Sequence, residues 1–355
     1  MNSINTSNYP IHFKTSSYTE LNTHLKTANY SKIFVLVDQN THEFCLPYFL
    51  SNLETDLEVE IIEIEAGEIH KNIETCSGVW NVLSELEADR KSLLINLGGG
   101  VITDLGGFVA STFKRGMAYI QVPTTLLSMV DASIGGKTGV DLGHLKNQIG
   151  VINTGEMVLI DTNYLNTLPE NQMRSGLAEM LKHGLIYSED YWNKFTALEK
   201  LSLDDLDVLI HESIDIKNQI VEKDPLEHHV RKTLNYGHTL GHAIESYYLS
   251  QPDKTAFLHG EAIAIGMILA SFISTKLTGF STETCQHIKD TIVDVFGQPK
   301  ISGKDIQPII DLLKFDKKNE HGKINFVLLE AIGKPKINCQ VENNLIFDAF
   351  NFYNS

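Results

Sequence analysis

The sequence has few of the residues that cross-link or anchor a chain. Four cysteines occur in 355 residues (Cys45, Cys76, Cys285 and Cys339), and no two of them form a CxxC pair. This argues against a disulfide framework and a thiolate zinc site, and it indicates the reduced thiols of a cytosolic protein. The N-terminal MNSINTSNYPIHF lacks the basic start and apolar run of a signal peptide. The most apolar long stretch, LHGEAIAIGMILASFIS, carries His259 and Glu261 near its start and falls short of a membrane span. We therefore expect a soluble, cytoplasmic protein.

Positive charge is scarce. The chain has 29 Lys and Arg residues against 45 Asp and Glu residues, a formal net charge of -16. Such a balance argues against a nucleic-acid or membrane surface, so neither partner is expected. It does not argue against an anionic small molecule, because a few lysines and arginines can converge in one cleft.

The first part of the chain has the pattern of an α/β domain. Short apolar, β-branched runs alternate with helix-like segments, as in a parallel sheet covered on both faces. The expected strands are residues 32–38, 58–67, 92–100, 117–125 and 157–162. After about residue 165 the pattern is mainly helical, with a late strand-like exception at 324–332. Since 355 residues exceed one ordinary core, we predict two domains, 1–167 and 168–355.

A glycine triplet, Gly98–Gly100, follows the expected strand LLINL and precedes a helix-like segment. Glycines permit positive φ and close backbone approach to a pyrophosphate, and a helix N-terminus favours an anion. The spacing is not GxGxxG, so a tight turn that binds nothing is the alternative. Polar residues also follow the neighbouring expected strands: Asp38, Glu68, Lys71, Thr124 and Thr125. Parallel-sheet folds bind ligands at this edge, so a nicotinamide dinucleotide is the preferred interpretation.

The segment DASIGGKTGVDLGHLKN presents a second candidate site. Its GGKTG superficially matches the end of a P-loop, but Asp131 stands where the first P-loop glycine should be. A glycine-rich loop that offers Lys137, Lys146 and Asn147 still suits an anionic substrate. The alternative is a flexible surface loop with solvated lysines.

The helical half concentrates imidazoles and charged groups in three stretches. SGLAEMLKHGLI contains Glu179, Lys182 and His183; RKTLNYGHTLGHAIE contains Arg231, Asn235, His238 and His242; FLHGEAIAIGM contains His259. Arg231, Asn235, His238 and His242 are spaced by four, three and four residues, which predicts one helical face. Three histidines with Glu179 indicate a catalytic metal site, for which zinc is suitable. Hydrogen-bonded core histidines are the alternative, and we expect His183 to be structural.

Taken together, these motifs resemble the 3-dehydroquinate synthase family over about residues 33–333. The most specific strings are GGGVITDLGGF, KRGMAYIQVPTTLLSMVDASIGGKTGV, SGLAEMLKHG, LNYGHTLGHAIE, LHGEAIAIGM and FDKKN. The resemblance implies a Rossmann-like NAD domain, a mainly α-helical C-terminal domain and a homodimer. It assigns one divalent metal, zinc or cobalt, to Glu179, His238 and His259. Spacing alone pairs His238 with His242 on the metal; the resemblance makes His242 a proton relay and substrate residue instead.

The resemblance also implies the remaining site residues. Those for NAD are Asp38, Glu68, Lys71, Gly99, Gly100, Val101, Asp104, Thr124 and Thr125, with Lys137 and Lys146. Those for a seven-carbon sugar-acid phosphate are Asp131, Lys137, Lys146, Asn147, Lys182, Lys217, Arg231, Asn235 and either Lys317 or Lys318. Arg115 resembles an arginine that reaches the substrate phosphate across the dimer interface.

Two features depart from the family pattern. Asn171 and Gln172 replace an Arg-Glu pair, which bears on NAD-side hydrogen bonds, and YYLSQPDKTAF lengthens the interval between His238 and His259. The expected reaction is NAD-dependent transient oxidation, phosphate elimination and aldol closure to 3-dehydroquinate. The alternatives are a sibling cyclase that makes an inosose or a valiolone, a metal-dependent alcohol or glycerol dehydrogenase, and a degenerate scaffold protein.

Overall fold

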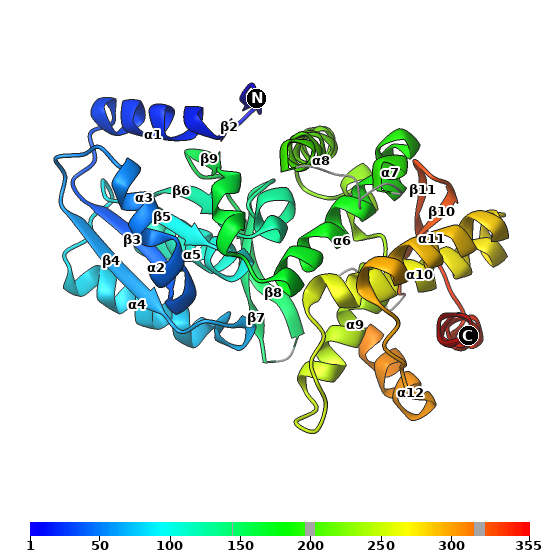
Figure 1. The fold of residues 1–355 in the computed structure, drawn as a ribbon. Coiled ribbons are helices and arrows are strands. Elements are labelled where there is room, and N and C mark those ends of the chain that lie inside the picture. The colour runs from blue at the N-terminus through cyan, green and yellow to red at the C-terminus, as the bar shows by residue number, and fades with distance from the viewer. Residues whose placement is uncertain (144, 196–202, 316–323) are drawn as a thin grey trace. The chain divides into compact units, whose positions relative to one another are not determined.

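A computed structural model describes residues 1–143, 145–195, 203–315 and 324–355 (Figure 1). The chain forms two compact units. The first comprises Met1–Met173 and Asp207–Asn218, and the second comprises Arg174–Leu206 and Gln219–Ser355. Residues 207–218 thus belong with the first unit, although they follow the predicted boundary in the sequence.

The first unit is built on a seven-stranded sheet of order β1-β2-β9-β6-β5-β3-β4. All strand pairs are parallel except β1 with β2. The strands are β1 (Ile4–Asn5), β2 (Pro10–Phe13), β3 (Ile33–Asp38), β4 (Val59–Ile64), β5 (Leu93–Gly98), β6 (Ala118–Pro123) and β9 (Met157–Ile160). The continuous apolar runs of β3 and β5 are buried, as a parallel sheet covered by helices requires. The predicted α/β, Rossmann-like fold class is confirmed, and each of the five expected strands is present.

Helices cover this sheet: α1 (Thr15–Thr27), α2 (Gln39–Phe44), α3 (Leu46–Asn52), α4 (Ile73–Glu85) and α5 (Gly100–Thr112). One core cluster joins alternate side chains of β3 and β5, such as Phe34, Leu36 and Leu94, to the buried faces of α4 and α5. A hairpin of β7 (Lys137–Leu142) and β8 (Leu145–Ile152) packs on α5. Packing on α5 holds the lysine-bearing hairpin beside the helix that follows the glycine triplet.

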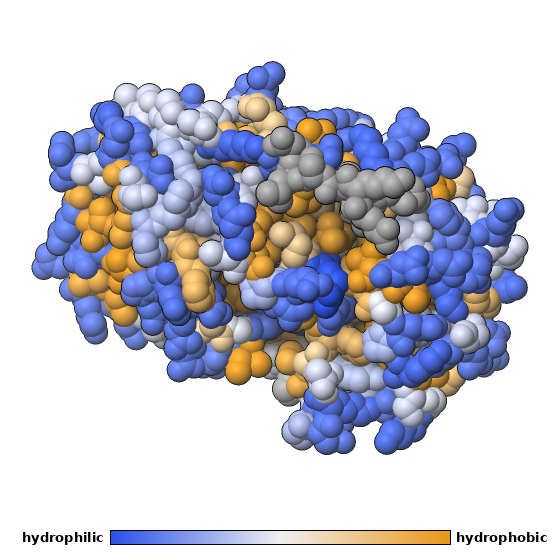
Figure 2. Space-filling view, viewed as in Figure 1, coloured by the Kyte–Doolittle hydropathy of each residue, from blue (hydrophilic) through white to orange (hydrophobic). Residues whose placement is uncertain are grey.

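The second unit is mainly helical. Its helices are α6 (Glu170–Tyr187), α7 (Glu189–Phe195), the end of α8 (Leu203–Lys223), α9 (His238–Leu249), α10 (His259–Leu277), α11 (Thr282–Phe296), α12 (Gly303–Leu312) and α13 (Asn343–Asn354). The strand expected at 324–332 forms a two-stranded sheet, β10 (Phe326–Ala331) with β11 (Lys334–Cys339). Around α11 and α12 the visible surface is mostly hydrophilic (Figure 2).

Helix α10 is the centre of the second core. It contacts α9, α11, α13 and β10. The stretch LHGEAIAIGMILASFIS was expected to fall short of a membrane span, but α10 has 19 residues and is long and apolar enough to cross a membrane by length and composition alone. Most of its residues are nevertheless buried within the protein, as in the core helix of a folded unit.

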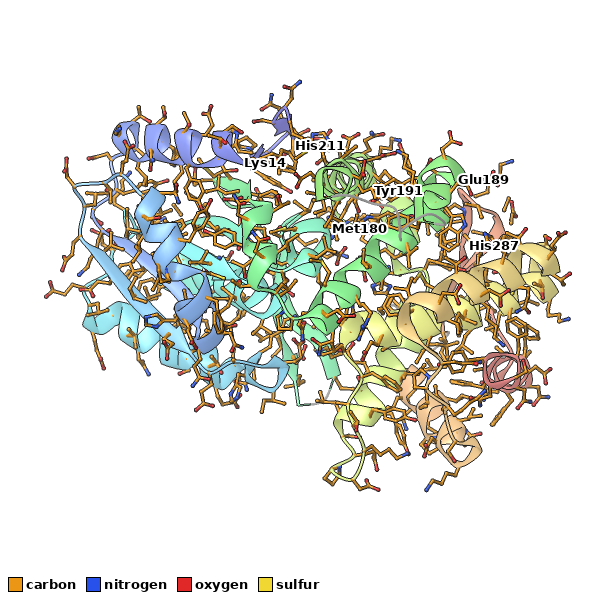
Figure 3. The ribbon with its side chains drawn as sticks, in the orientation of Figure 1. Lys14, Met180, Glu189, Tyr191, His211 and His287 are labelled. Carbon is orange, nitrogen blue, oxygen red and sulfur yellow. The ribbon has the colours of Figure 1, made fainter. Side chains whose placement is uncertain are left out.

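The first part of α8 contacts the rest of the first unit at the end of β2. Lys14 forms an ion pair with Asp207, and the ring of Phe13 lies 4.6 Å from that of His211. Figure 3 labels Lys14 and His211, which lie close together where α8 passes the start of α1. Further along α8, Lys217 Nζ donates to Asp131 Oδ1 at 2.6 Å and to the Asp131 carbonyl at 2.7 Å. These contacts explain why residues 207–218 cluster with the sheet.

Candidate active site

Glycines bring three helices of the second unit into backbone contact. A Cβ at Gly266 of α10 would lie 2.0 Å from the carbonyl oxygen of Gly237, just before α9. A Cβ at Gly260, next to His259, would lie 2.1 Å from the carbonyl oxygen of Ser175 on α6. The Gly260 N–H also donates to Ser175 Oγ at 2.9 Å. Only glycine permits such close approach, so α10 is held against both α9 and α6.

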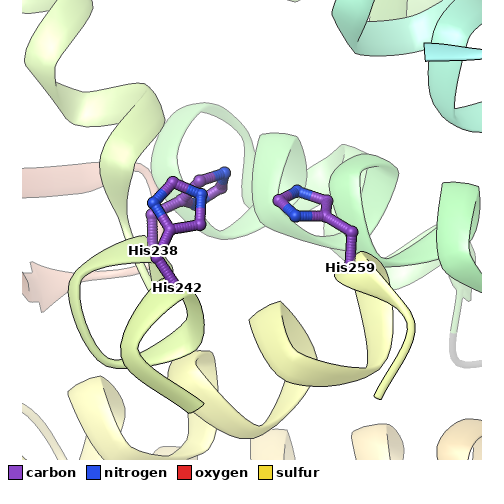
Figure 4. Close-up of side chains that lie close together, drawn as sticks. All are labelled: His238, His242 and His259. Atoms are coloured by element: carbon purple, nitrogen blue, oxygen red, sulfur yellow. The ribbon is translucent and has the colours of Figure 1, made fainter. Parts of the chain in front are cut away.

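This packing gathers the three histidines (Figure 4). The ring centroids lie 5.1 Å apart for His238 and His242, 5.7 Å for His238 and His259, and 5.6 Å for His242 and His259. One nitrogen of each lies within 4.8 Å of the others, close enough to share one metal ion. Both spacing and the family resemblance had selected residues in this group.

Glu179 of α6 completes the cluster. Its Oε1 lies 3.4 Å from Nε2 of His238 and 3.4 Å from Nε2 of His259. The side chain is fully buried and forms an ion pair with Lys182, one turn further along α6. A buried carboxylate facing two imidazole nitrogens is a donor set that suits zinc or cobalt, and it leaves coordination positions open.

The tautomer of two histidines follows from their other contacts. His238 Nδ1 lies 3.1 Å from the Tyr236 carbonyl oxygen, and His259 Nδ1 lies 3.0 Å from Glu245 Oε2. A carbonyl or carboxylate oxygen can only accept, so Nδ1 carries the proton in both rings. In the neutral rings Nε2 is then the lone-pair nitrogen, and in both it faces Glu179. Glu245 and Tyr236 were not among the residues predicted from the sequence, although Glu245 lies two helical turns after His238.

Burial and charge set the protonation of the cluster. Burial would raise the pKa of Glu179, but the charges of Lys182 and His238 hold it well below its ordinary value. Burial lowers the pKa of His238, which favours the neutral ring that binds a metal. Burial also opposes charge on His259, yet the carboxylates of Glu245 and Glu179 outweigh it and raise its pKa to about 10. The cluster therefore strongly favours positive charge between its two carboxylates.

The segment before α9 is not the continuous helix that the spacing predicted. Residues Val230–Asn235 form a short 3-10 helix, and Gly237 at φ 78° separates it from α9. Arg231 and Asn235 are fixed by acidic residues that the sequence analysis did not select. The Asp224 carboxylate accepts the backbone N–H of Arg231 at 3.0 Å, and Glu227 Oε1 accepts from Asn235 Nδ2 at 2.8 Å. Arg231 also donates from one guanidinium nitrogen to the Pro225 carbonyl at 2.6 Å.

In the first unit the glycine turn serves close packing. Gly99 has φ -74°, so it does not use the positive φ that glycine permits. A Cβ at Gly98 would instead lie 2.5 Å from Ile102, and one at Gly99 would lie 2.9 Å from Thr125. Helix α5 begins at Gly100, so its first turn carries Val101 and leads to Asp104. The Thr124 N–H donates to the Gly98 carbonyl at 3.0 Å, which holds the loops after β5 and β6 together.

Most of the other residues expected around NAD form one network of ion pairs. Lys71 Nζ lies 2.7 Å from Asp104 Oδ2 and 2.8 Å from Asn147 Oδ1. Lys146 forms an ion pair with Glu68 and another with Asp141 at 2.9 Å. Asp141 Oδ1 also accepts the Asn147 N–H at 2.6 Å. The network joins the short 3-10 helix at Glu68–His70, helix α5 and the β7–β8 hairpin, and Asp141, which was not among the predicted residues, contacts both Lys146 and Asn147.

The remaining predicted residues are placed as follows. Asp38 caps α2 by accepting the Thr41 N–H at 2.8 Å. Lys137 begins β7 after Gly135 and Gly136, which adopt φ 93° and 68°, so this segment is a defined turn into a hairpin. Arg115 is exposed at the end of a short 3-10 helix, with φ 68°. Lys317 and Lys318 lie outside the described residues. Gln172 donates its N–H to Asn171 Oδ1 at 2.9 Å in the first turn of α6.

The fold is that of the sugar phosphate cyclases. A 2-deoxy-scyllo-inosose synthase complexed with carbaglucose-6-phosphate, NAD+ and Co2+ aligns with a TM-score of 0.85 at 24% identity, covering 99% of each chain. A 2-epi-5-epi-valiolone synthase from Streptomyces hygroscopicus subsp. jinggangensis 5008, with NAD+ and Zn2+ bound, aligns with a TM-score of 0.84 at 23% identity, covering 99% of this chain and 98% of that one.

Sequence comparison is more specific than the fold. The family model for the 3-dehydroquinate synthase N-terminal region matches residues 61–175, and that for the C-terminal region matches residues 176–319. The 3-dehydroquinate synthase of Parabacteroides distasonis is 40% identical over 94% of each chain. That of Dictyoglomus thermophilum is 40% identical over 96% of this chain and 94% of its own. The chain belongs to the 3-dehydroquinate synthase family.

Proposed function

We propose that this enzyme converts 3-deoxy-D-arabino-heptulosonate 7-phosphate into 3-dehydroquinate and phosphate, as a carbon–oxygen lyase that uses NAD and one divalent metal, zinc or cobalt. The observation that carries the proposal is the buried cluster in which Nε2 of His238 and of His259 face one carboxylate oxygen of Glu179. Membership of the 3-dehydroquinate synthase family and the NAD+, Co2+ and Zn2+ named for the structural relatives support it.

The metal ligands in this proposal are Glu179, His238 and His259. When bound, the metal supplies Lewis acidity to a substrate hydroxyl, and NAD supplies a transient hydride acceptor. The chain presents the Nε2 atoms of two imidazoles and the carboxylate of Glu179 for this purpose. His242, whose ring lies 5.6 Å from that of His259, relays a proton to or from the substrate.

The first unit binds NAD in this proposal. The residues assigned to it are Asp38, Glu68, Lys71, Gly99, Gly100, Val101, Asp104, Thr124 and Thr125, with Lys137 and Lys146. The N-terminus of α5 favours a pyrophosphate, because its first N–H groups have no partner within the helix. The ion-pair network around Lys71 keeps the hairpin and α5 in a fixed arrangement, which lowers the ordering cost of binding.

Cationic and amide groups bind the anionic substrate and orient it for reaction. The residues assigned to it are Asp131, Lys137, Lys146, Asn147, Lys182, Lys217, Arg231 and Asn235. Arg115 reaches the substrate phosphate of a second subunit in a cytoplasmic homodimer, which its exposed position in one subunit permits. The departing phosphate itself accepts the neighbouring proton, so the protein supplies chiefly orientation and charge. The domain boundary that we propose lies near residues 168–172.

The test is turnover of the purified protein with NAD, Zn2+ and 3-deoxy-D-arabino-heptulosonate 7-phosphate. Phosphate and 3-dehydroquinate should form in equal amounts, without net NADH, and a chelator or the omission of NAD should abolish both. Turnover of a sugar phosphate that lacks the carboxylate, but not of this substrate, would identify a sibling cyclase. Accumulation of NADH from a simple polyol would identify a dehydrogenase, and either result would refute the proposal.

A further inference from the structure

Glu245 is a buried acid that none of the proposed roles uses. It lies on α9 seven residues after His238, so two helical turns separate the two residues on nearly the same face. The residue is 4% exposed, and its neighbours Ala243, Ile244 and Tyr248 are buried as well. An ionised carboxylate in such surroundings is costly unless a charged or hydrogen-bonding group compensates it.

His259 provides that compensation. Glu245 Oε2 lies 3.0 Å from Nδ1 of His259, while Glu179 Oε1 lies 3.4 Å from Nε2 of the same ring. The imidazole is thus held between two carboxylates, one on each nitrogen. The ring can neither rotate nor exchange its tautomer without losing the hydrogen bond to Glu245, because a carboxylate cannot donate to Nδ1.

The other proposed histidine ligand is supported differently. His238 donates from Nδ1 to the carbonyl oxygen of Tyr236, a neutral acceptor at 3.1 Å. A carboxylate is the stronger acceptor, and it places negative charge on the far side of the ring. A carboxylate in this position raises the basicity of a ligating imidazole and fixes its orientation. The Nδ1 atom of His259 therefore donates to a negatively charged carboxylate, whereas that of His238 donates to a neutral carbonyl.

We infer that Glu245 is a positioning residue that holds His259 in its metal-binding orientation and tautomer and thereby strengthens binding of the divalent metal. The inference rests on the proposed metal site, because Glu245 acts through His259 and does not itself reach the ion. Replacing such a partner of a metal-ligating histidine generally weakens metal binding by about 10- to 100-fold. Glu245→Gln, which keeps the size of the side chain and removes its charge, should show a loss within this range.

The matched control is Glu261→Gln. Glu261 lies in the first turn of α10, two residues after His259, and its Oε2 accepts the N–H of Leu258 at 2.8 Å. The same chemical change there weakens the cap of the helix that carries His259, but it leaves the acceptor of the His259 ring intact. We expect the control to lower the melting temperature and to leave the metal dissociation constant within about twofold of the wild type, since it removes no partner of a ligand.

The experiment titrates the metal-free full-length protein with Co2+, followed by the absorption of the bound ion, and with Zn2+ in competition with a chromophoric chelator. Calorimetry of each metal-free variant measures folding separately. Weaker binding by Glu245→Gln alone, with an altered Co2+ absorption band, supports the inference. If the melting temperature of Glu245→Gln falls while its metal dissociation constant stays that of the wild type, the role is structural and the inference is overturned. If the wild type binds no stoichiometric metal, the proposed metal site itself fails.

Discussion

The contact between Gly260 and Ser175 offers the sharpest test of how the histidine cluster is built. Gly260→Ala adds one methyl group to α10 at the residue after His259. That methyl carbon would lie 2.1 Å from the Ser175 carbonyl oxygen and 2.5 Å from its Cα, whereas real Cβ contacts are essentially never shorter than 3.0 Å. Both opposing atoms are backbone, so no side chain can rotate away. The start of α10 and α6 must separate by about 1 Å, the difference between the 2.1 Å contact and the 3.0 Å limit.

The expected cost follows from that displacement. Overpacking a well-packed contact costs about 1–3 kcal/mol. For a unit of this size, 1 kcal/mol lowers the melting temperature by about 2–4 °C. The larger effect should be on the cluster, because His259 moves with the start of α10 while Glu179 stays with α6. A displacement of about 1 Å at a metal ligand should weaken metal binding by at least about tenfold, the lower end of the loss seen when a ligand's orientation is disturbed.

Calorimetry and Co2+ titration of the full-length protein measure the two effects. The matched control is Gly303→Ala at the start of α12, where an added Cβ meets no atom within 4 Å. The control should keep its metal affinity and melt at or slightly above the wild-type temperature, because alanine is the better helix former. If Gly260→Ala binds Co2+ as the wild type does, then the close approach of α6 and α10 does not position His259, and the cluster is held together in some other way.

Two further predictions concern buried carboxylates. Asp141→Asn removes the ion pair with Lys146 and weakens the hydrogen bond that Asp141 accepts from the Asn147 N–H. A loss of about 1.4 kcal/mol in the free energy of NAD binding should follow, which raises the dissociation constant for NAD about tenfold in a calorimetric titration. If the dissociation constant for NAD stays unchanged in Asp141→Asn, the ion-pair network around Lys71 and Lys146 does not support NAD binding. Asp305 accepts from Tyr247 at 2.8 Å and pairs with Lys254 at 2.5 Å, and although burial opposes ionisation, these partners hold the pKa of Asp305 below its ordinary 3.8. Its folded pKa lies below its unfolded value, so the stabilisation is complete above pH 3.8 and is lost as the pH falls through the folded pKa. The melting-temperature gap between wild type and Asp305→Asn should be constant near neutrality and close in strong acid; a gap that persists there would contradict the linkage.

The sheet could be predicted because its signal is local. A buried parallel strand needs a short continuous apolar run, and KIFVLVD and SLLINLGGG have that property without reference to any other part of the chain. The same locality limits what periodicity can show. Residues 207–218 have ordinary helical periodicity, and their place in the first unit depends on Lys14, Asp131 and Phe13, which are distant in sequence. Periodicity can identify a helix but not the core against which it packs.

The candidate site shows a similar division. Histidines and Glu179 stand out in a sequence because such groups are unusual on apolar helices. Glu245 and Asp141 do not stand out, because acidic residues are common and their importance depends on which nitrogen lies about 3 Å away in the folded chain. The spacing of Arg231 and His238 predicted one helical face, but Gly237 breaks the helix between them.

The glycines around the histidines were visible in the sequence, yet their purpose was not. Gly237 and Gly241 precede and follow His238, and Gly260 follows His259, in a chain with 25 glycines. A glycine in a helix normally costs about 1 kcal/mol relative to alanine, so one that lies beside a proposed ligand needs a compensating reason. The structure supplies the reason at Gly260 and Gly266: a carbonyl oxygen of another segment occupies the place of the missing side chain. These glycines lower the intrinsic stability of α10, but they allow His238 and His259, which lie on different helices, to face the carboxylate of Glu179. The compensation can be recognised only when the contacts of α10 with α6 and with the segment before α9 are known.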